Sequence, residues 1–221
     1  MNVNQSTRLD KFIQPREKRL PMLSPALLKD ITTTVAWALN EDLGQDLSTT
    51  AQAQVSELDI TAALIPQSNN AVATIINRDD CIVCGVAWVT EVFKQLDEAL
   101  GVCESEAESQ QTKITWFVND GQMAKANTVL CELSGNARTL LTGERVALNF
   151  LQTLSGTATL TSSYVKELAG SNTQLLDTRK TLPGLRSAQK YAVSCGGGKN
   201  HRIGLFDAFL IKENHIAACG G

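Results

Sequence analysis

The sequence predicts an α/β protein in which a mixed α+β amino-terminal part precedes a parallel β/α part. Two observations support this prediction. Short β-type runs and amphipathic helices alternate irregularly in the first 137 residues, whereas helices and compact apolar strands alternate regularly from about residue 138. Regular alternation of this kind is typical of parallel β/α architecture. We therefore divide the chain into an N-terminal α+β domain, residues 1–137, and a β/α domain, residues 138–221.

The first predicted element is a helix that begins after Ser24 and ends near Asn40. Ser24 is placed as an N-cap, and Pro25 suits the first helical turn because its missing N–H would be unpaired there anyway. The apolar residues recur at helical spacing, at Leu27, Leu28, Ile31, Val35 and Leu39.

The rest of the N-terminal domain combines short strands with one further helix. We predict strands at residues 60–64, 71–76 and 113–118, a helix at residues 88–96, and a turn at residues 119–121. The strands are short and broken by polar residues. The N-terminal domain is therefore predicted to mix helices with short strands.

Residues 120–135 resemble the strand-turn-strand unit of biotinyl and lipoyl carrier domains, which gives the first domain a hammerhead-like character. Those carriers modify a lysine that is displayed at a hairpin tip. Lys125 lacks the flanking methionines of the biotinyl signal. The resemblance is therefore to a shape, and Lys125 is interpreted as a solvated side chain.

The second domain opens with a helix predicted over residues 137–154. A further helix then leads to an apolar strand at 175–178, and this strand is followed by a helix at 187–193, a glycine run at 196–198 and a second strand at 208–212. In parallel β/α folds the residues at the carboxyl ends of strands face the functional side. Arg179, Lys180 and Lys212 stand at such ends.

The distribution of charge points to anion binding in the second domain. Residues 1–137 contain 10 Lys or Arg against 18 Asp or Glu, whereas residues 138–221 contain 10 against 5. The chain as a whole is acidic and only 5% aromatic, which argues against nucleic-acid binding.

Membrane, secretory and metal-centre classes are not favoured. The apolar runs are too short to span a bilayer, and residues 1–20 are basic without an apolar signal core, so we expect a cytoplasmic protein. The six cysteines are irregularly spaced. Cys81 and Cys84 form a CxxC within an apolar run that has no second pair, so no metal site is assigned.

Six cationic or imidazole side chains are the candidate ligands for anions. Each one alone is weak evidence, because an isolated charged side chain is more often solvated. Their joint position at strand ends and beside glycines, which let backbone approach a ligand, makes them a candidate site. These residues are Arg145, Arg179, Lys180, His201, Arg202 and Lys212.

Six motifs surround these candidate residues. They begin with GERVALNFLQ and SGTAT and continue with DTRKTLPGLR, KYAV, GGGKNHRIGLFD and LIKENH, over a span of about 70 residues. In sequence, order and spacing they are similar to the quinolinate phosphoribosyltransferase family.

The resemblance implies an enzyme of de novo NAD biosynthesis. The family transfers phosphoribose from phosphoribosyl pyrophosphate to quinolinate with Mg²⁺, and releases nicotinic acid mononucleotide, carbon dioxide and pyrophosphate. It also implies a β/α barrel in the second domain and a homodimer. Both substrates carry several negative charges, which suits clustered guanidinium and ammonium groups.

The roles of individual residues are likewise implied by the resemblance. Arg179, His201, Arg202 and Lys212 are expected to surround quinolinate, with Arg145 reaching in from the partner subunit. Thr178 is expected to be a further substrate-binding residue. Lys180, together with Lys212, is expected to contact the phosphoribosyl donor, and these two lysines are the candidate catalytic residues.

The barrel is expected to be incomplete in this chain. Residues 138–221 provide room for two or three β/α units, and the acidic residues that the family uses for Mg²⁺ and ribose are absent. Two alternatives therefore stay open: a non-catalytic or carrier-like assembly module, and a related phosphoribosyltransferase that uses another base such as nicotinate.

Overall fold

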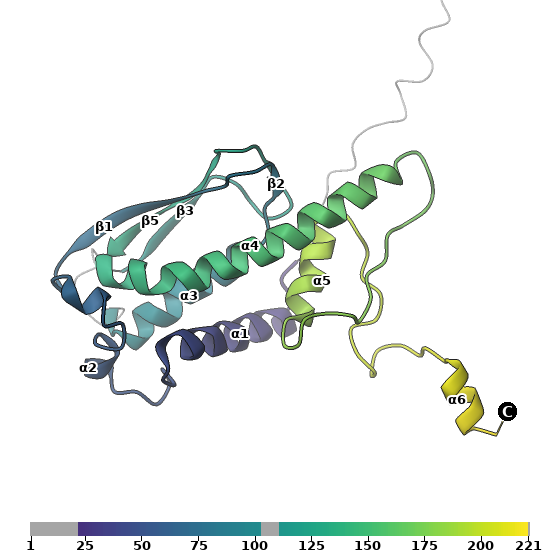
Figure 1. Cartoon of the computed structure of the whole chain (residues 1–221), viewed down its shortest axis with the longest axis horizontal. Helices are drawn as coiled ribbons and strands as arrows, with labels where there is room; N and C mark the ends of the chain where they lie inside the picture. The colour runs from purple at the N-terminus through teal and green to yellow at the C-terminus, as the bar shows by residue number, and fades with distance from the viewer. Residues whose placement is uncertain (1–21, 103–110, 221) are drawn as a thin grey trace, which may run out of the picture.

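A computed structural model describes residues 22–102 and 111–220. Its helices and strands follow one another along the chain as shown in Figure 1. The elements are α1 (Pro25–Leu43), α2 (Gln52–Val55), the 3₁₀ turn η1 (Ala62–Leu64), β1 (Asn70–Ile76), β2 (Cys81–Ile82), α3 (Val86–Ala99), β3 (Lys113–Trp116), β4 (Met123–Ala124), β5 (Val129–Asn136), α4 (Ala137–Glu167), α5 (Arg186–Cys195) and α6 (Glu213–Ala218).

The sheet is antiparallel and has β5 at its centre, in the order β1-β5-β3. Cys131 of β5 pairs with Ile75 on one side and with Trp116 on the other. β2 and β4 form a separate antiparallel pair. Leu130, Cys131 and Leu133 are buried, so the central strand contributes most of the sheet's share of the core.

Helix α4 starts directly where β5 ends. The side-chain oxygen of Asn136 accepts hydrogen bonds from the backbone N–H groups of Arg138 and Thr139 at 3.0 and 3.4 Å, which caps the helix. α4 then runs beneath the sheet and packs against α3 and, near its end, against α5 (Figure 1). One helix therefore joins the N-terminal layer to the C-terminal segments.

The helices predicted from apolar spacing are confirmed. Ser24 caps α1 by accepting a hydrogen bond from Leu27 N at 3.2 Å, and Ile31, Val35 and Leu39 are buried as their spacing predicts. The helix predicted at residues 88–96 is α3. The helix predicted at 187–193 is α5, and the one predicted at 137–154 is the first part of the longer α4.

The strand predicted at residues 60–64 is wrong. The Asp59 carboxylate accepts hydrogen bonds from Thr61 N at 3.0 Å and Ala62 N at 2.9 Å, which folds these residues into the η1 turn. A side chain that bonds nearby backbone competes with strand pairing. The strands predicted at 71–76 and 113–118 are confirmed as β1 and β3, although β3 ends at Trp116.

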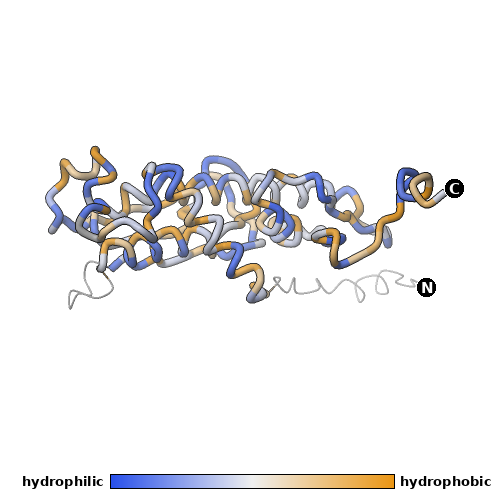
Figure 2. The backbone as a smooth tube through the Cα atoms, turned by 90° about the horizontal axis from the view of Figure 1, so that it is seen from below, coloured by the Kyte–Doolittle hydropathy of each residue, from blue (hydrophilic) through white to orange (hydrophobic). Residues whose placement is uncertain are grey.

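The two strands predicted in the second domain do not form as strands. Residues 175–178 are reduced to a single parallel bridge between Leu176 and Lys199. Residues 208–212 have no regular secondary structure and pair with no described strand, and a strand needs a neighbour to satisfy its amides and carbonyls. Apolar side chains stay exposed there, Phe209 at 98%, and Figure 2 shows the apolar stretch standing off the main body before the C-terminus.

Among the described helices, none combines the length and the apolar character that crossing a membrane requires. The longest, α4, carries polar and charged residues along its exposed side.

Two glycines of α4 lie in opposite environments and give a test of this packing. A Cβ at Gly143 would lie 2.6 Å from Phe93 Cε1 of α3, whereas one at Gly156 would meet no atom within 4 Å. We expect Gly143→Ala to lower the free energy of unfolding by about 1–3 kcal/mol through overpacking. Gly156→Ala should raise it by about 0.5–1 kcal/mol, because alanine favours the helix. Urea unfolding measures both, and equal effects of one sign would contradict the packing of α3 on α4.

Candidate functional site

The structure brings together two of the segments that carry predicted anion ligands. Asp177 N donates to Lys199 O at 3.1 Å, and Lys199 N donates to Leu175 O at 2.8 Å. The bridge between Leu176 and Lys199 is parallel, so the residues that follow each partner leave it in the same direction. The segments 178–180 and 201–202 therefore emerge side by side.

The second of these segments is directed by the end of α5. A Cβ on Gly196 would lie 2.4 Å from the carbonyl oxygen of Ala158 and 2.6 Å from Thr161 Cβ, both on α4. Only glycine allows the backbone to pass so close to the neighbouring helix. The close passage carries the chain from α5 into Lys199 and so into the parallel bridge.

Helix α5 is tied to the N-terminal layer through Asp120. The carboxylate accepts hydrogen bonds from Gly85 N at 2.8 Å, from Val86 N at 3.1 Å and from Tyr191 Oη at 2.9 Å. Tyr191 also packs its ring against Trp88, with 5.6 Å between ring centroids. Burial raises the pKa of the Asp120 carboxyl, and its hydrogen bonds from Val86, Tyr191 and Gly85 oppose that shift.

The predicted ligands on the first segment remain open to a ligand. Arg179 is half-buried, and its Nε is shielded from solvent without a hydrogen-bond partner among the described residues. Lys180 is exposed, and its backbone N donates to Thr178 Oγ1 at 3.1 Å. A guanidinium group and an ammonium group on consecutive residues are the kinds of group that bind anions.

The predicted ligands on the second segment lie at the base of a tight loop. The backbone N of His201 bonds to Asp177, and Arg202 Nη1 donates to Ala208 O at 3.2 Å. The Asp207 carboxylate accepts from Ile203 N at 2.7 Å and Gly204 N at 3.0 Å, and these hydrogen bonds lower its pKa. The Asp207 carboxylate therefore stabilises the turn of the loop at residues 203–207.

The structure does not gather the remaining two cations with these segments. Lys212 is exposed immediately before α6, which stands apart from α4 and α5 (Figure 1). Arg145 is exposed on α4, and neither side chain forms an ion pair with another described residue. The sequence placed Lys212 at a strand end, and that strand is not formed.

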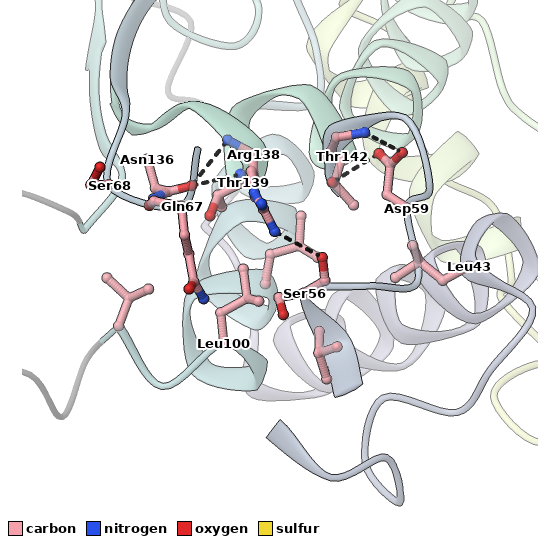
Figure 3. A pocket seen from close by; sticks show the side chains of 14 residues that line it. Leu43, Ser56, Asp59, Gln67, Ser68, Leu100, Asn136, Arg138, Thr139 and Thr142 are labelled. Carbon is pink, nitrogen blue, oxygen red and sulfur yellow. Dashed lines mark hydrogen bonds between the residues drawn. The ribbon is translucent and has the colours of Figure 1, made fainter. Parts of the chain in front are cut away.

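A cavity of about 480 Å³ lies beneath the start of α4 and contains none of the predicted ligands (Figure 3). Arg138 Nε donates to Ile65 O at 2.6 Å, and Nη2 donates to Ala63 O at 3.0 Å. Asp59 accepts from Thr142 Oγ1 at 3.0 Å. The principal charged groups of this cavity are thus occupied in holding the η1 turn against α4.

Sequence reasoning missed two polar links that shape the site. One is Asp120 with Tyr191, and the other is a buried ion pair between Asp177 and Lys190. The sequence places Asp120 in a predicted turn and Lys190 in one of the family motifs, and neither position indicates a buried partner. Helical spacing gives no signal that Lys190 is buried, because its neighbours three and four residues away are mostly polar: Arg186, Ser187, Val193 and Ser194.

The raised pKa of Asp120 predicts a pH dependence of stability. A carboxyl with a raised folded-state pKa stabilises the fold fully at low pH and loses this contribution as pH rises through that pKa. We expect the melting temperature of Asp120→Asn, relative to the unaltered chain, to improve as pH rises from about 4 to 7.

Asp46→Asn is the matched control, because hydrogen bonds from Ser48 lower the pKa of Asp46. The contribution of Asp46 to stability is nearly complete above its ordinary pKa and is lost as the pH falls below about 4, so the relative melting temperature of Asp46→Asn should stay nearly constant from about pH 4 to 7. Thermal unfolding followed by circular dichroism measures both variants, and parallel pH profiles for Asp120→Asn and the unaltered chain would refute the assignment.

Comparisons with known proteins identify two domains of one family in succession along the chain. Residues 59–155 match the family model for the quinolinate phosphoribosyl transferase N-terminal domain, and residues 157–221 match the model for its C-terminal domain. Together the two models span most of the described chain.

The chain is also similar in sequence to individual proteins of this family. A chloroplastic nicotinate-nucleotide pyrophosphorylase (carboxylating) of Oryza sativa subsp. japonica is 39% identical over 93% of this chain and 49% of its own length. A probable nicotinate-nucleotide pyrophosphorylase (carboxylating) of Bacillus subtilis is 44% identical over 73% of this chain and 52% of its own.

The nicotinate-nucleotide pyrophosphorylase structure from Francisella tularensis is 46% identical, with a TM-score of 0.72, over 88% of this chain and 60% of that one. The chain spans about half the length of the curated relatives it matches. Both domain models, the relatives and the solved structure agree, and the chain belongs to the quinolinate phosphoribosyltransferase family.

Proposed function

We propose that the protein transfers phosphoribose from phosphoribosyl pyrophosphate to quinolinate, with decarboxylation to nicotinic acid mononucleotide. Family membership supports this proposal, and one structural observation carries it: the parallel bridge sets segments 178–180 and 201–202 side by side. Between them these segments present two guanidinium groups, one ammonium group and one imidazole to an anion.

Quinolinate suits this group of side chains because it carries two carboxylates on one aromatic ring. Arg179 and Arg202 can each offer two parallel N–H donors to a carboxylate, and His201 adds a further donor. Thr178 contributes a hydroxyl on the same segment as Arg179. Arg145 of a partner subunit and Lys212 complete the proposed quinolinate ligands.

Lys180 and Lys212 are proposed to contact the phosphoribosyl donor and to act as the catalytic residues. The pyridine nitrogen of quinolinate attacks the anomeric carbon while pyrophosphate leaves, and that nitrogen has no proton to lose. No general base is needed for this step. Lysine side chains instead stabilise the charge that develops on the leaving pyrophosphate.

Decarboxylation then follows from the charge on the ring. Once the nitrogen is bonded to ribose, it is positive and stabilises the electron pair that stays on the adjacent ring carbon when the carboxylate leaves as CO2, and that carbon then takes up a proton from solvent. Guanidinium groups on the second carboxylate keep the ring oriented during this loss. The chain's own residues thus bind, orient and stabilise charge.

Mg²⁺ is proposed to accompany the phosphoribosyl donor. The described residues contain no group of three or more His, Cys, Asp or Glu side chains that could hold a metal ion. No step is therefore assigned to a metal bound by these residues. A homodimer that shares Arg145, a cytoplasmic location and the boundary between residues 137 and 138 stay predictions.

We also propose that the second domain is the first part of a β/α barrel. The exposed apolar stretch that includes Leu205, Phe206, Phe209 and Ile211 supports this, because such side chains ordinarily pack under neighbouring elements. The relatives that match the chain are about twice as long as the matched region.

Binding of quinolinate to the purified chain tests the proposal directly. We expect calorimetric titration to detect quinolinate and to show weaker binding of nicotinate, which has one carboxylate fewer. Arg179→Ala should weaken quinolinate binding by roughly 10- to 100-fold, the value of a hydrogen bond to a charged group. Arg78→Ala is the control, because it removes an equal charge from an exposed turn.

An assay for nicotinic acid mononucleotide with phosphoribosyl pyrophosphate and Mg²⁺ separates the remaining alternatives. Product formation supports the full activity. Preference for nicotinate would favour the related phosphoribosyltransferase. A folded chain that binds neither compound, or an equal loss in Arg78→Ala and Arg179→Ala, would favour the non-catalytic module.

A further inference from the structure

Lys190 is a charged side chain in a place where charge is costly. It lies on α5 with only 3% of its surface exposed, and it forms an ion pair with Asp177, whose side chain is 6% exposed. An unpaired ion in such surroundings would be strongly destabilising. Each side chain of the pair therefore stabilises the buried charge of the other.

We propose that the Lys190–Asp177 pair is the positioning device that fixes the two anion-binding segments relative to each other. The proposal rests on the proposed function for the identity of the anion. Lys190 is too deeply buried to touch a substrate, so it acts through Asp177 and through the backbone. It is a positioning residue for the cations that follow.

The contacts of Asp177 reach both segments at once. Its Oδ1 accepts from Lys190 Nζ and from the backbone N of His201, the latter at 2.8 Å. Asp177 itself directly precedes Thr178 and Arg179 in the chain. One carboxylate thus joins the start of the first segment to the start of the second.

Lys190 and Asn200 complete the junction. Lys190 Nζ lies 3.5 Å from His201 O. With its amide oriented by its hydrogen-bond partners, Asn200 donates from its side-chain nitrogen to Asp177 Oδ2 at 2.7 Å and to Lys190 O at 2.9 Å. Helix α5 and both segments therefore meet at a single buried carboxylate.

Charge gives the pair a second effect on anion binding. Asp177 places a negative charge one residue before Thr178, where it would oppose the arrival of an anion. The ammonium of Lys190 neutralises this charge from the buried side. The cations on the exposed side are then left to face the ligand.

The test compares three variants of the chain. Lys190→Met keeps the shape of the side chain and removes its charge, leaving Asp177 unpaired. The double variant Asp177→Asn with Lys190→Gln replaces the ion pair by a neutral hydrogen-bonded pair. Tyr191→Phe is the matched control, because it removes another buried hydrogen bond of α5, that to Asp120, without touching Asp177.

Two readouts are measured, each at a temperature where the variant is folded. Hydrogen exchange at residues 199–202 reports whether the segment is held, and calorimetry reports quinolinate affinity. Lys190→Met should exchange at least tenfold faster there and bind quinolinate at least tenfold more weakly. The double variant should recover much of both losses. Tyr191→Phe should lower the melting temperature and leave both readouts unchanged.

The outcomes separate this inference from the proposed function. If the unaltered chain does not bind quinolinate, the proposed function fails, and the exchange comparison still decides whether the pair holds the segments. Unchanged exchange in Lys190→Met, or equal losses in Tyr191→Phe, would overturn the positioning role. Should Lys190→Met not fold, Lys190→Gln, which can still donate one neutral hydrogen bond to Asp177, takes its place.

Discussion

The structure depends on the continuity of α4, a helix of 31 residues and about 46 Å. It begins at the cap that Asn136 provides at the end of β5, and it stays buried on one side from Leu140 to Ser162. The early turns pack on α3, and the late turns receive α5. The relative position of the antiparallel layer and the anion-binding segments therefore follows from one helix.

The sequence predicted those elements whose burial follows a simple period. Ile31, Val35 and Leu39 recur at helical spacing, and all three are buried in α1. The sequence predicts a helix that ends at residue 154 and a further helix that leads to residue 175, whereas α4 is continuous to Glu167. In the fold, Thr157 and Thr161 donate to the carbonyls four residues earlier, so their hydroxyls are satisfied within the helix.

Local periodicity could not predict structure that depends on a hydrogen bond from a competing side chain or on a residue distant in the sequence. Residues 60–64 are β-type by composition, yet the Asp59 carboxylate folds them into a turn. The site shows the same limit: the resemblance supplied the candidate ligands, but only the fold reveals that Asp177 meets Lys190 and His201. Lys212 has no described neighbour that would bring it to these segments, so its role rests on the resemblance alone.

The acidic residues near the site explain how a cluster of cations can stay available to a ligand. Only five Asp or Glu residues occur from residue 138 onward, and two of them lie in the anion-binding region. Asp177 is engaged by Lys190 and by backbone, and Asp207 accepts two backbone N–H groups. Neither forms an ion pair with Arg179 or Arg202 among the described residues. These carboxylates thus hold the loops in place without an ion pair to either arginine, and the Arg202 guanidinium keeps one hydrogen bond within its loop, to Ala208 O.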